Sequence, residues 1–179
     1  MIGSTSFWGA DSEAICASGG ARLASLDGLV LLTGGVTGVG ETVGRSFFDE
    51  RRRMSRPTDV YHILPEESWN WDYGTTLFAG ADMAERREIL GRLTGTYLAI
   101  EGGPGTAHEA AVARSNGAIV VPVGRTGGVS RDLYASAPRP ASVPERDWEL
   151  LGDSDRSIDL VSEALGTIMN VLTRGEGSC

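Results

Sequence analysis

Residues 101–109 combine glycine, hydroxyl and carboxylate groups in an order suited to holding a phosphate. They read Glu-Gly-Gly-Pro-Gly-Thr-Ala-His-Glu and follow an apolar run, Tyr97–Ile100, that predicts a buried strand. Glycines let a phosphate approach the backbone, and the helix expected after them points its free N–H groups and positive dipole end at the anion. The predicted phosphate ligands in this turn are Gly102, Gly103, Gly105 and Thr106.

Glu109 lies one turn into the expected helix, close to where a phosphate-bearing ligand would lie. Cleaving an N-glycosidic bond needs a carboxylate near the anomeric carbon, either to stabilise an oxocarbenium-like transition state or to activate water. Thr106 and Glu109 also have the spacing of a capping box, which stabilises the start of a helix by about 1 kcal/mol and needs no function. The spacing alone gives the two interpretations similar weight.

A second unit of strand, glycine turn and helix precedes the first along the chain. Leu29–Leu32 is a continuous apolar run, which favours a strand buried on both faces of a parallel sheet, and Glu41–Met54 is expected to be a helix. The turn between them is neither a P-loop nor a GxGxxG motif. Because ligands bind beyond the carboxyl ends of parallel strands, its glycines extend the predicted phosphate site. They are Gly34, Gly35 and Gly38.

The segment 101–109 resembles the PGGxGTxxE signature of the LOG family, once described as lysine decarboxylases and best known for cytokinin-riboside monophosphate phosphoribohydrolases. Glu101 stands where that signature has proline. In this departure the chain resembles looser relatives in the superfamily, such as molybdenum-cofactor carrier proteins. Those relatives share the fold and need not share the hydrolase activity.

Met83–Arg87 is similar to a second signature of that family, a Met-x-x-Arg-Lys-like segment, with Arg87 in place of lysine. The resemblance implies that Arg86 orients Glu109 or holds the substrate phosphate, which a planar guanidinium does well through paired hydrogen bonds. Together with the neighbouring glycines, this match favours a site at Glu109 over a simple helix cap.

The resemblance also covers the start of the chain. The family's first strand ends in a Gly-Ser pair similar to Gly3-Ser4, which adds Ser4 to the expected phosphate ligands. It further implies a Rossmann-like fold, usually in a homodimer whose sites lie near the interface.

The alternation of short apolar runs with helical segments predicts an α/β fold, a single Rossmann-like domain over residues 1–179. Five short strands with helices between them imply right-handed crossovers and a doubly wound parallel sheet with helices on both faces. The expected strands lie within 1–7, 29–32, 60–64, 97–100 and 118–123, and the expected helices cover 11–25, 41–54, 82–93, a segment from 106, and 156–174. The proline-rich stretch 135–145 is expected to be an irregular connection.

The charge of the chain restricts its partners. A net charge of −8 argues against nucleic acid and anionic membranes, because neither attracts an acidic protein, so the expected partner is a nucleotide or another phosphorylated small molecule. There is no apolar run of about 18 residues and no signal peptide, so we expect a cytoplasmic protein. With Cys16 and Cys179 as the two cysteines, neither a disulfide framework nor a cysteine-rich metal site is available, and we expect no metal and no cofactor.

Aromatic and basic residues elsewhere have both functional and structural interpretations. Three aromatics in the polar stretch 66–80 could stack on a base or pack beneath a loop: Trp69, Trp71 and Tyr73. Arg51–Arg53 are interpreted as a solvated helix end, where positive charge suits the dipole. His62 alternates with apolar neighbours, so we expect a packed residue rather than a metal ligand.

The sequence therefore predicts a protein that binds a nucleotide or another phosphate ligand. The more specific prediction is hydrolysis of a nucleoside 5′-monophosphate to free base and ribose 5-phosphate, with Glu109 and Arg86 as the catalytic residues. The alternative is a carrier or sensor that holds a nucleotide or a molybdenum cofactor without turnover. Fold alone does not decide between them, because function belongs to the site.

Overall fold

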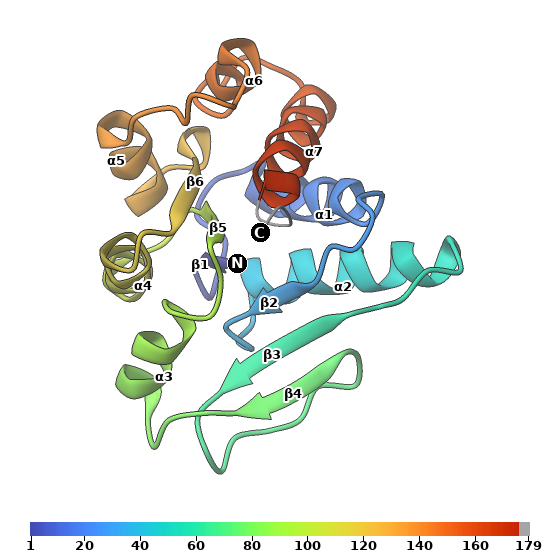
Figure 1. Ribbon diagram of the computed structural model, residues 1–179, viewed down its shortest axis with the longest axis vertical. Coiled ribbons are helices and arrows are strands. Elements are labelled where there is room, and N and C mark those ends of the chain that lie inside the picture. Colours follow the sequence, from blue (N-terminus) through green and yellow to red (C-terminus); the bar gives the residue numbers. More distant parts are fainter. Residues whose placement is uncertain (176–179) are drawn as a thin grey trace.

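The structure is a computed structural model that describes residues 1–175, and within them helices separate all consecutive strands except β3 and β4 (Figure 1). The strands are β1 (Ile2–Gly3), β2 (Leu31–Thr33), β3 (Val60–Leu64), β4 (Thr75–Phe78), β5 (Thr96–Ile100) and β6 (Ile119–Val123). The helices are α1 (Ser12–Leu23), α2 (Val39–Arg53), α3 (Met83–Leu90), α4 (Pro104–Ser115), α5 (Gly128–Ser136), α6 (Glu145–Leu150) and α7 (Ile158–Gly175), with a 3-10 turn, η1, at Gly124–Thr126.

All strand pairs are parallel, and they form two ladders in the orders β1-β5-β6 and β2-β3-β4. The nitrogen of Met1 donates to the carbonyl oxygen of Leu32 at 2.9 Å, so the ladders meet at β1 and β2. From β1 the chain builds outward through β2, β3 and β4, and then returns to the other side of β1 with β5 and β6. The strand order therefore reverses beside β1, which is where doubly wound folds bind their ligands.

Helices cover both faces of these strands, as predicted (Figure 1). On one face α1, α2 and α7 enclose a core that includes Phe47 and Leu165, and on the other α3 and α4 enclose a smaller one around Leu90. The strand β5 contributes to both cores, since Leu98 belongs to the first and Tyr97 to the second. Burial on both faces explains why β5 is apolar from Tyr97 to Ile100.

Gly20 lies in the middle of α1, where a glycine is normally unfavourable. A Cβ on Gly20 would lie 2.5 Å from the carbonyl oxygen of Val43 in α2, closer than van der Waals contact allows. The helices α1 and α2 therefore pack so closely that only glycine fits at this position.

The stretch 66–80 contains a strand that the sequence analysis missed. The strand β4 pairs with β3, but its side chains are exposed or half-buried, so no run of buried apolar residues marks it. Trp71 and Tyr73 pack around His62, with ring centroids 5.6 and 4.6 Å from the imidazole, while Trp69 is 52% exposed. The packing interpretation is correct for these two aromatics and for His62, which is fully buried between them.

Arg51 corrects the interpretation of the basic run at the end of α2. Its side chain is 3% exposed, and the guanidinium donates to the carbonyl oxygens of Leu26 and Pro57 at 2.5 and 3.4 Å. Arg53, by contrast, pairs with Glu50 at the surface. Arg51 therefore satisfies carbonyl groups of two loops and is not part of a solvated helix end.

The C-terminal third differs from the prediction in its boundaries. The irregular connection is confined to 137–144, because α5 extends to Ser136 and α6 begins at Glu145. The final helix begins at Ile158 rather than at 156, and residues 176–179, including Cys179, lie outside the described part of the chain.

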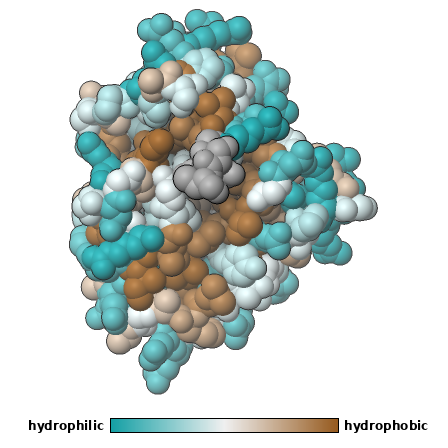
Figure 2. All heavy atoms as spheres, viewed as in Figure 1, coloured by the Kyte–Doolittle hydropathy of each residue, from teal (hydrophilic) through white to brown (hydrophobic). Residues whose placement is uncertain are grey.

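Figure 2 shows hydrophobic residues in the middle of the face seen in Figure 1 and hydrophilic residues around its margin. Within residues 1–175, no helix combines the length and the apolarity that a membrane-crossing segment needs.

Candidate functional site

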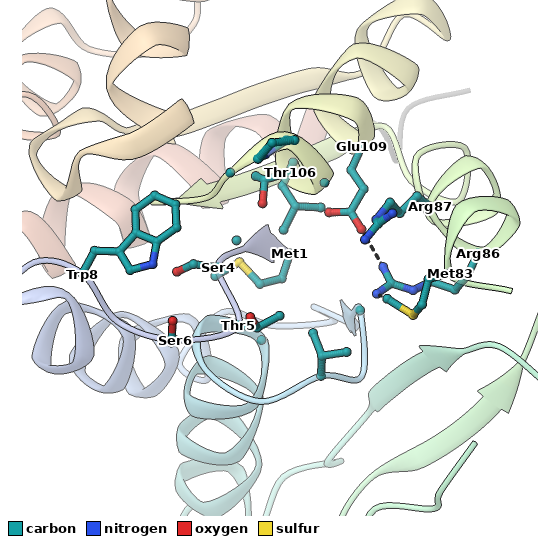
Figure 3. A pocket seen from close by; sticks show the side chains of 18 residues that line it. Met1, Ser4, Thr5, Ser6, Trp8, Met83, Arg86, Arg87, Thr106 and Glu109 are labelled. Carbon is teal, nitrogen blue, oxygen red and sulfur yellow. Dashed lines mark hydrogen bonds and ion pairs between the residues drawn. The ribbon is translucent and has the colours of Figure 1, made fainter.

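A pocket of about 240 Å³ lies at the carboxyl ends of β1, β2 and β5, at the reversal of strand order (Figure 3). Its wall is formed by the loop after β1, the turn after β2, the start of α3 and the start of α4. The lining residues predicted from the sequence are Ser4, Gly34, Arg86, Gly103, Gly105, Thr106 and Glu109. Residues from four separate segments of the chain thus meet in one cavity.

A larger hollow, of about 590 Å³, lies near the amino ends of β2 and β5 and is lined by residues such as Val30, Leu93 and Met169. It contains neither the glycine turns nor the Arg86–Glu109 pair. Ligands of parallel α/β folds bind at the carboxyl ends of the strands, so we place the candidate site in the smaller pocket.

The helix α4 begins two residues earlier than predicted, and this decides between the two interpretations of Thr106. Gly103 is the N-cap, Pro104 occupies the first helical turn, and Thr106 already lies within the helix. The N-cap has no side-chain hydrogen bond, so the capping box predicted as an alternative for Thr106 and Glu109 is wrong. The N–H groups of the first turn are left without intrahelical partners and border the pocket.

Glu109 is instead paired with Arg86 from α3. Arg86 Nη1 donates to Glu109 Oε1 at 2.5 Å, and the two side chains are 3% and 7% exposed. The Arg86 Nη2 group lies 3.8 Å from the sulfur of Met83, while its buried Nε has no hydrogen-bond partner within residues 1–175. The predicted pair is therefore assembled, and the guanidinium retains an unused donor.

Burial and pairing shift the pKa values of Glu109 and Arg86 in opposite directions. Burial raises the pKa of Glu109, and the positive charge of Arg86 opposes that rise. Burial likewise lowers the pKa of Arg86 against the attraction of Glu109, and an arginine stays charged even so. A buried carboxylate with a raised pKa is suited to proton transfer.

Three of the predicted phosphate glycines shape the turns without lining the pocket. Gly102 has φ +100°, and a Cβ there would lie 2.5 Å from the Thr106 side chain. Gly38 has φ +82° and packs against the backbone of Thr5, and Gly35 has φ +67° and packs against Leu64. These glycines hold the conformation of the two turns, while Gly34, Gly103 and Gly105 border the cavity itself.

Ser4 borders the pocket, but its hydroxyl is already engaged. It donates to Glu101 Oε2 at 2.5 Å, and the backbone N–H groups of Trp8 and Gly9 donate to Glu101 Oε1 at 3.0 and 2.8 Å. Burial alone would raise the pKa of Glu101, but hydrogen bonds from Ser12, Ser4 and these two N–H groups hold it below its usual value. The residue at the proline position of the signature is therefore a buried carboxylate that fixes the loop after β1.

The sequence analysis gave no site role to several residues that line the pocket, among them Arg87 and Trp8. Arg87 lies along the start of α4, where a Cβ on Gly105 would be 3.1 Å from its Nε, and it makes no ion pair within the described residues. Trp8 is 57% exposed and lies at the end of the pocket opposite Glu109 (Figure 3). Its position soon after Gly3-Ser4, in a loop expected beside the phosphate turn, was the available signal. None of Trp69, Trp71 and Tyr73 lines this pocket.

Comparison with known proteins identifies relatives of this chain. A family model described as the SLOG cluster4 family matches residues 1–143. The X-ray structure of TM1055, a Northeast Structural Genomics Consortium target, is similar with a TM-score of 0.63 and 25% sequence identity, over 82% of this chain and 85% of that one. No curated protein matches. The matched family is related to the LOG family, whose signature residues 101–109 resemble.

Proposed function

This chain belongs to the SLOG cluster4 family, and we propose that its pocket binds a nucleoside 5′-monophosphate and hydrolyses the N-glycosidic bond. The observation that carries the proposal is the buried Arg86–Glu109 pair, at 2.5 Å, in a pocket bordered by the start of α4. Such a reaction needs a phosphate anchor and a carboxylate within one cavity.

The start of α4 would anchor the phosphate. Its free N–H groups and the positive end of its dipole attract an anion, and the absence of a side chain at Gly103 leaves the approach open. Arg87 lies beside Gly105 and would supply a countercharge to the phosphate. Local positive groups of this kind allow an acidic protein to bind a phosphate.

Glu109 would act at the anomeric carbon. As the bond from C1′ to the base nitrogen breaks, its carboxylate stabilises the positive charge that develops on the sugar and accepts a proton from the attacking water. The water oxygen bonds to C1′, and the electron pair of the broken bond goes to the base nitrogen. That nitrogen takes a proton from solvent, and Glu109 returns its own proton to solvent, which gives free base and ribose 5-phosphate. Arg86 would hold Glu109 in place, and its positive charge would favour the ionised form of the Glu109 carboxyl against the effect of burial.

The test is release of free base from AMP, GMP, CMP and an N6-modified AMP, separated by chromatography. Glu109→Gln keeps the size of the side chain and removes its charge, so we expect turnover to fall by about 10²-fold or more while nucleotide binding survives. Arg86→Lys keeps the charge but loses the planar fork, and turnover should fall here too. The matched controls are Glu163→Gln on the exposed surface of α7 and Arg92→Lys in the exposed turn after α3, and both should leave turnover unchanged.

One observation favours a carrier or sensor as the second candidate. The N–H groups of Trp8 and Gly9, in the loop after β1, are occupied by Glu101, which replaces the proline of the LOG signature. A proline side chain cannot accept these hydrogen bonds, so a chain with proline at this position must hold the loop in another way. Wild-type protein that binds a nucleotide but releases no base from any of the four substrates would support this second candidate against the hydrolase.

A further inference from the structure

We propose that Trp8 is a stacking platform that selects ligands carrying a planar aromatic ring. This inference rests on the proposed nucleotide site and adds to it the residue that recognises the ring. Trp8 lines the pocket and is 57% exposed, so a large aromatic surface at the mouth of the cavity is left to solvent. Aromatic faces bind nucleobases by stacking, with little dependence on the identity of the base.

The backbone N–H of Trp8 is hydrogen-bonded to a buried carboxylate, that of Glu101. Its N–H donates to Glu101 Oε1 at 3.0 Å, and the neighbouring Gly9 N–H donates to the same oxygen at 2.8 Å. Glu101 itself is fully buried and is bonded on its other oxygen by Ser4. A residue whose main chain is fixed in this way loses little further entropy when a ligand binds.

Gly128 makes room for the indole ring beside the phosphate turn, and Gly103 lies within ordinary contact distance of the ring. A Cβ on Gly128 would lie 2.8 Å from Trp8 Cζ3, and a Cβ on Gly103 would lie 3.5 Å from Trp8 Cη2. Gly128 also has φ +56°, so a side chain there would be strained as well as crowded. The ring therefore packs on the main chain next to the N-cap of α4 and keeps much of its surface exposed.

Figure 3 places the Trp8 ring at one end of the pocket and the Arg86–Glu109 pair at the other, with Thr106 at the start of α4 between them. A planar ring on Trp8 could be the base of a mononucleotide or a second ring attached beyond the phosphate. Both ligands carry the planar aromatic ring that would stack on Trp8, and a binding experiment can distinguish them.

The experiment is isothermal titration calorimetry in the Glu109→Gln background, which prevents turnover during the measurement. The probes are ribose 5-phosphate, AMP and diadenosine diphosphate. Removing a stacking aromatic should weaken binding of its base about tenfold, so Trp8→Ala should raise the Kd of an adenine-bearing probe by that factor and leave ribose 5-phosphate unchanged. Trp8→Phe should lie between wild type and alanine. Trp69→Ala is the matched control, because Trp69 is 52% exposed and lies outside the pocket.

The three probes distinguish the outcomes. Weaker AMP binding in Trp8→Ala assigns the platform to the base of a mononucleotide, and weaker binding of diadenosine diphosphate alone assigns it to a ring beyond the phosphate. An unchanged Kd for both adenine probes, or an equal loss with ribose 5-phosphate, overturns the proposal. If Trp8→Ala leaves every Kd unchanged while the Glu109→Gln protein binds ribose 5-phosphate, the stacking role of Trp8 is rejected and the phosphate site is retained. If that protein binds none of the probes, the nucleotide site is lost as well. Thermal unfolding of each variant shows whether it is folded.

Discussion

A Cβ built on Gly34 would lie 3.0 Å from Nη1 of Arg86, the atom that donates to Glu109. Gly34 follows β2 and borders the pocket, so the absence of its side chain leaves room for the buried guanidinium. Gly34 therefore leaves room for the ion pair, and its predicted contact with a phosphate stays a prediction.

The variant Gly34→Ala tests this relationship. The added methyl group should push the Arg86 guanidinium by a few tenths of an ångström and weaken its hold on Glu109. Small misplacements of catalytic groups cost up to about 10²-fold in rate, so we expect base release to fall by about tenfold while nucleotide binding is retained. Gly19→Ala in α1, far from the pocket, is the control and should leave the rate unchanged. Equal rates for Gly34→Ala and wild type would show that the guanidinium is not confined by this glycine.

The N-cap of α4 offers a test of the phosphate anchor that does not disturb the fold. Gly103 has an extended backbone, φ −111° and ψ −153°, and a side chain there meets only ordinary contacts with Trp8. Aspartate is a favourable N-cap, so Gly103→Asp should preserve or slightly raise the melting temperature. Its carboxylate would occupy the N–H groups and repel phosphate, so ribose 5-phosphate binding should weaken by at least about tenfold.

Gly103→Asn has nearly the same shape without the charge, and calorimetry should show a smaller loss for it than for Gly103→Asp. Equal losses would mean that the side chain blocks the pocket sterically and that no anion binds at the helix terminus.

The stability of the loop after β1 should depend on the ionisation of Glu101. Its pKa is held below the ordinary glutamate value of about 4.3, so the stabilisation by its carboxylate is complete above that pH and is lost as the pH falls through the lowered value. Glu101→Gln should lower the free energy of unfolding by about 1–3 kcal/mol at pH 7, because it weakens hydrogen bonds to a buried charged acceptor. Urea titrations at a series of pH values measure this difference. We expect the gap between wild type and variant to narrow below pH of about 4.3, and a gap that widens toward acid pH would contradict the assignment.

Arg51 and Arg53 lie two residues apart, but we expect them to contribute very differently to the free energy of unfolding. Arg51→Ala leaves the carbonyl groups of Leu26 and Pro57 without their buried donor, which should cost about 2–4 kcal/mol of unfolding free energy. Arg53→Ala removes an exposed pair with Glu50 and should cost no more than about 1 kcal/mol. Chemical denaturation of the two variants gives the comparison directly. Similar losses would show that burial of Arg51 adds nothing to stability.

These two arginines also show where sequence reasoning reaches its limit. The buried strand β3 was predicted with the bounds it has, because a short, mostly apolar run that ends at Pro65 has few other interpretations. Arg51 looks like its neighbours in the sequence, and only the packing of two loops against α2 distinguishes it. The strand β4 was missed for the same kind of reason, because its exposed residues are specified by pairing with β3 and not by a pattern of their own.

The residues of the site also divide into those marked by a local sequence pattern and those defined by contacts that are distant in the sequence. The glycine turn 102–105 and Glu109 could be found because they lie in one short segment, and Arg86 because it belongs to a second recognisable segment. The position of Trp8 beside the phosphate turn was the one signal for it, and the hydrogen bonds between Glu101 and this loop could not be predicted, since they span about 90 positions of the chain. Such contacts appear once the loop after β1 and the end of β5 are placed side by side.

The last prediction concerns the two carboxylates at the ends of the segment 101–109, which should titrate on opposite sides of the ordinary value. Burial raises the pKa of Glu109 even though Arg86 opposes it, whereas hydrogen bonds from Ser12, Ser4 and two backbone N–H groups lower the pKa of Glu101. Environments that separate the pKa values of two carboxyl groups in this way allow one group to exchange protons while the other stays ionised.

Carbon-13 NMR of protein labelled at the glutamate side-chain carboxyl measures both values, with Glu109→Gln and Glu101→Gln assigning the two signals. We expect a midpoint above about 4.3 for Glu109 and below it for Glu101. If Glu109 acts as the base, kcat/KM for base release should fall as the pH drops through its raised pKa, and the fall should begin at a higher pH than for an ordinary glutamate. The substrate phosphate also titrates, near pH 6, and its effect should be common to wild type and Glu163→Gln. Midpoints on the same side of 4.3 would show that burial and hydrogen bonding do not separate the two groups, and Glu109 would then lose its distinction as the proton-exchanging residue.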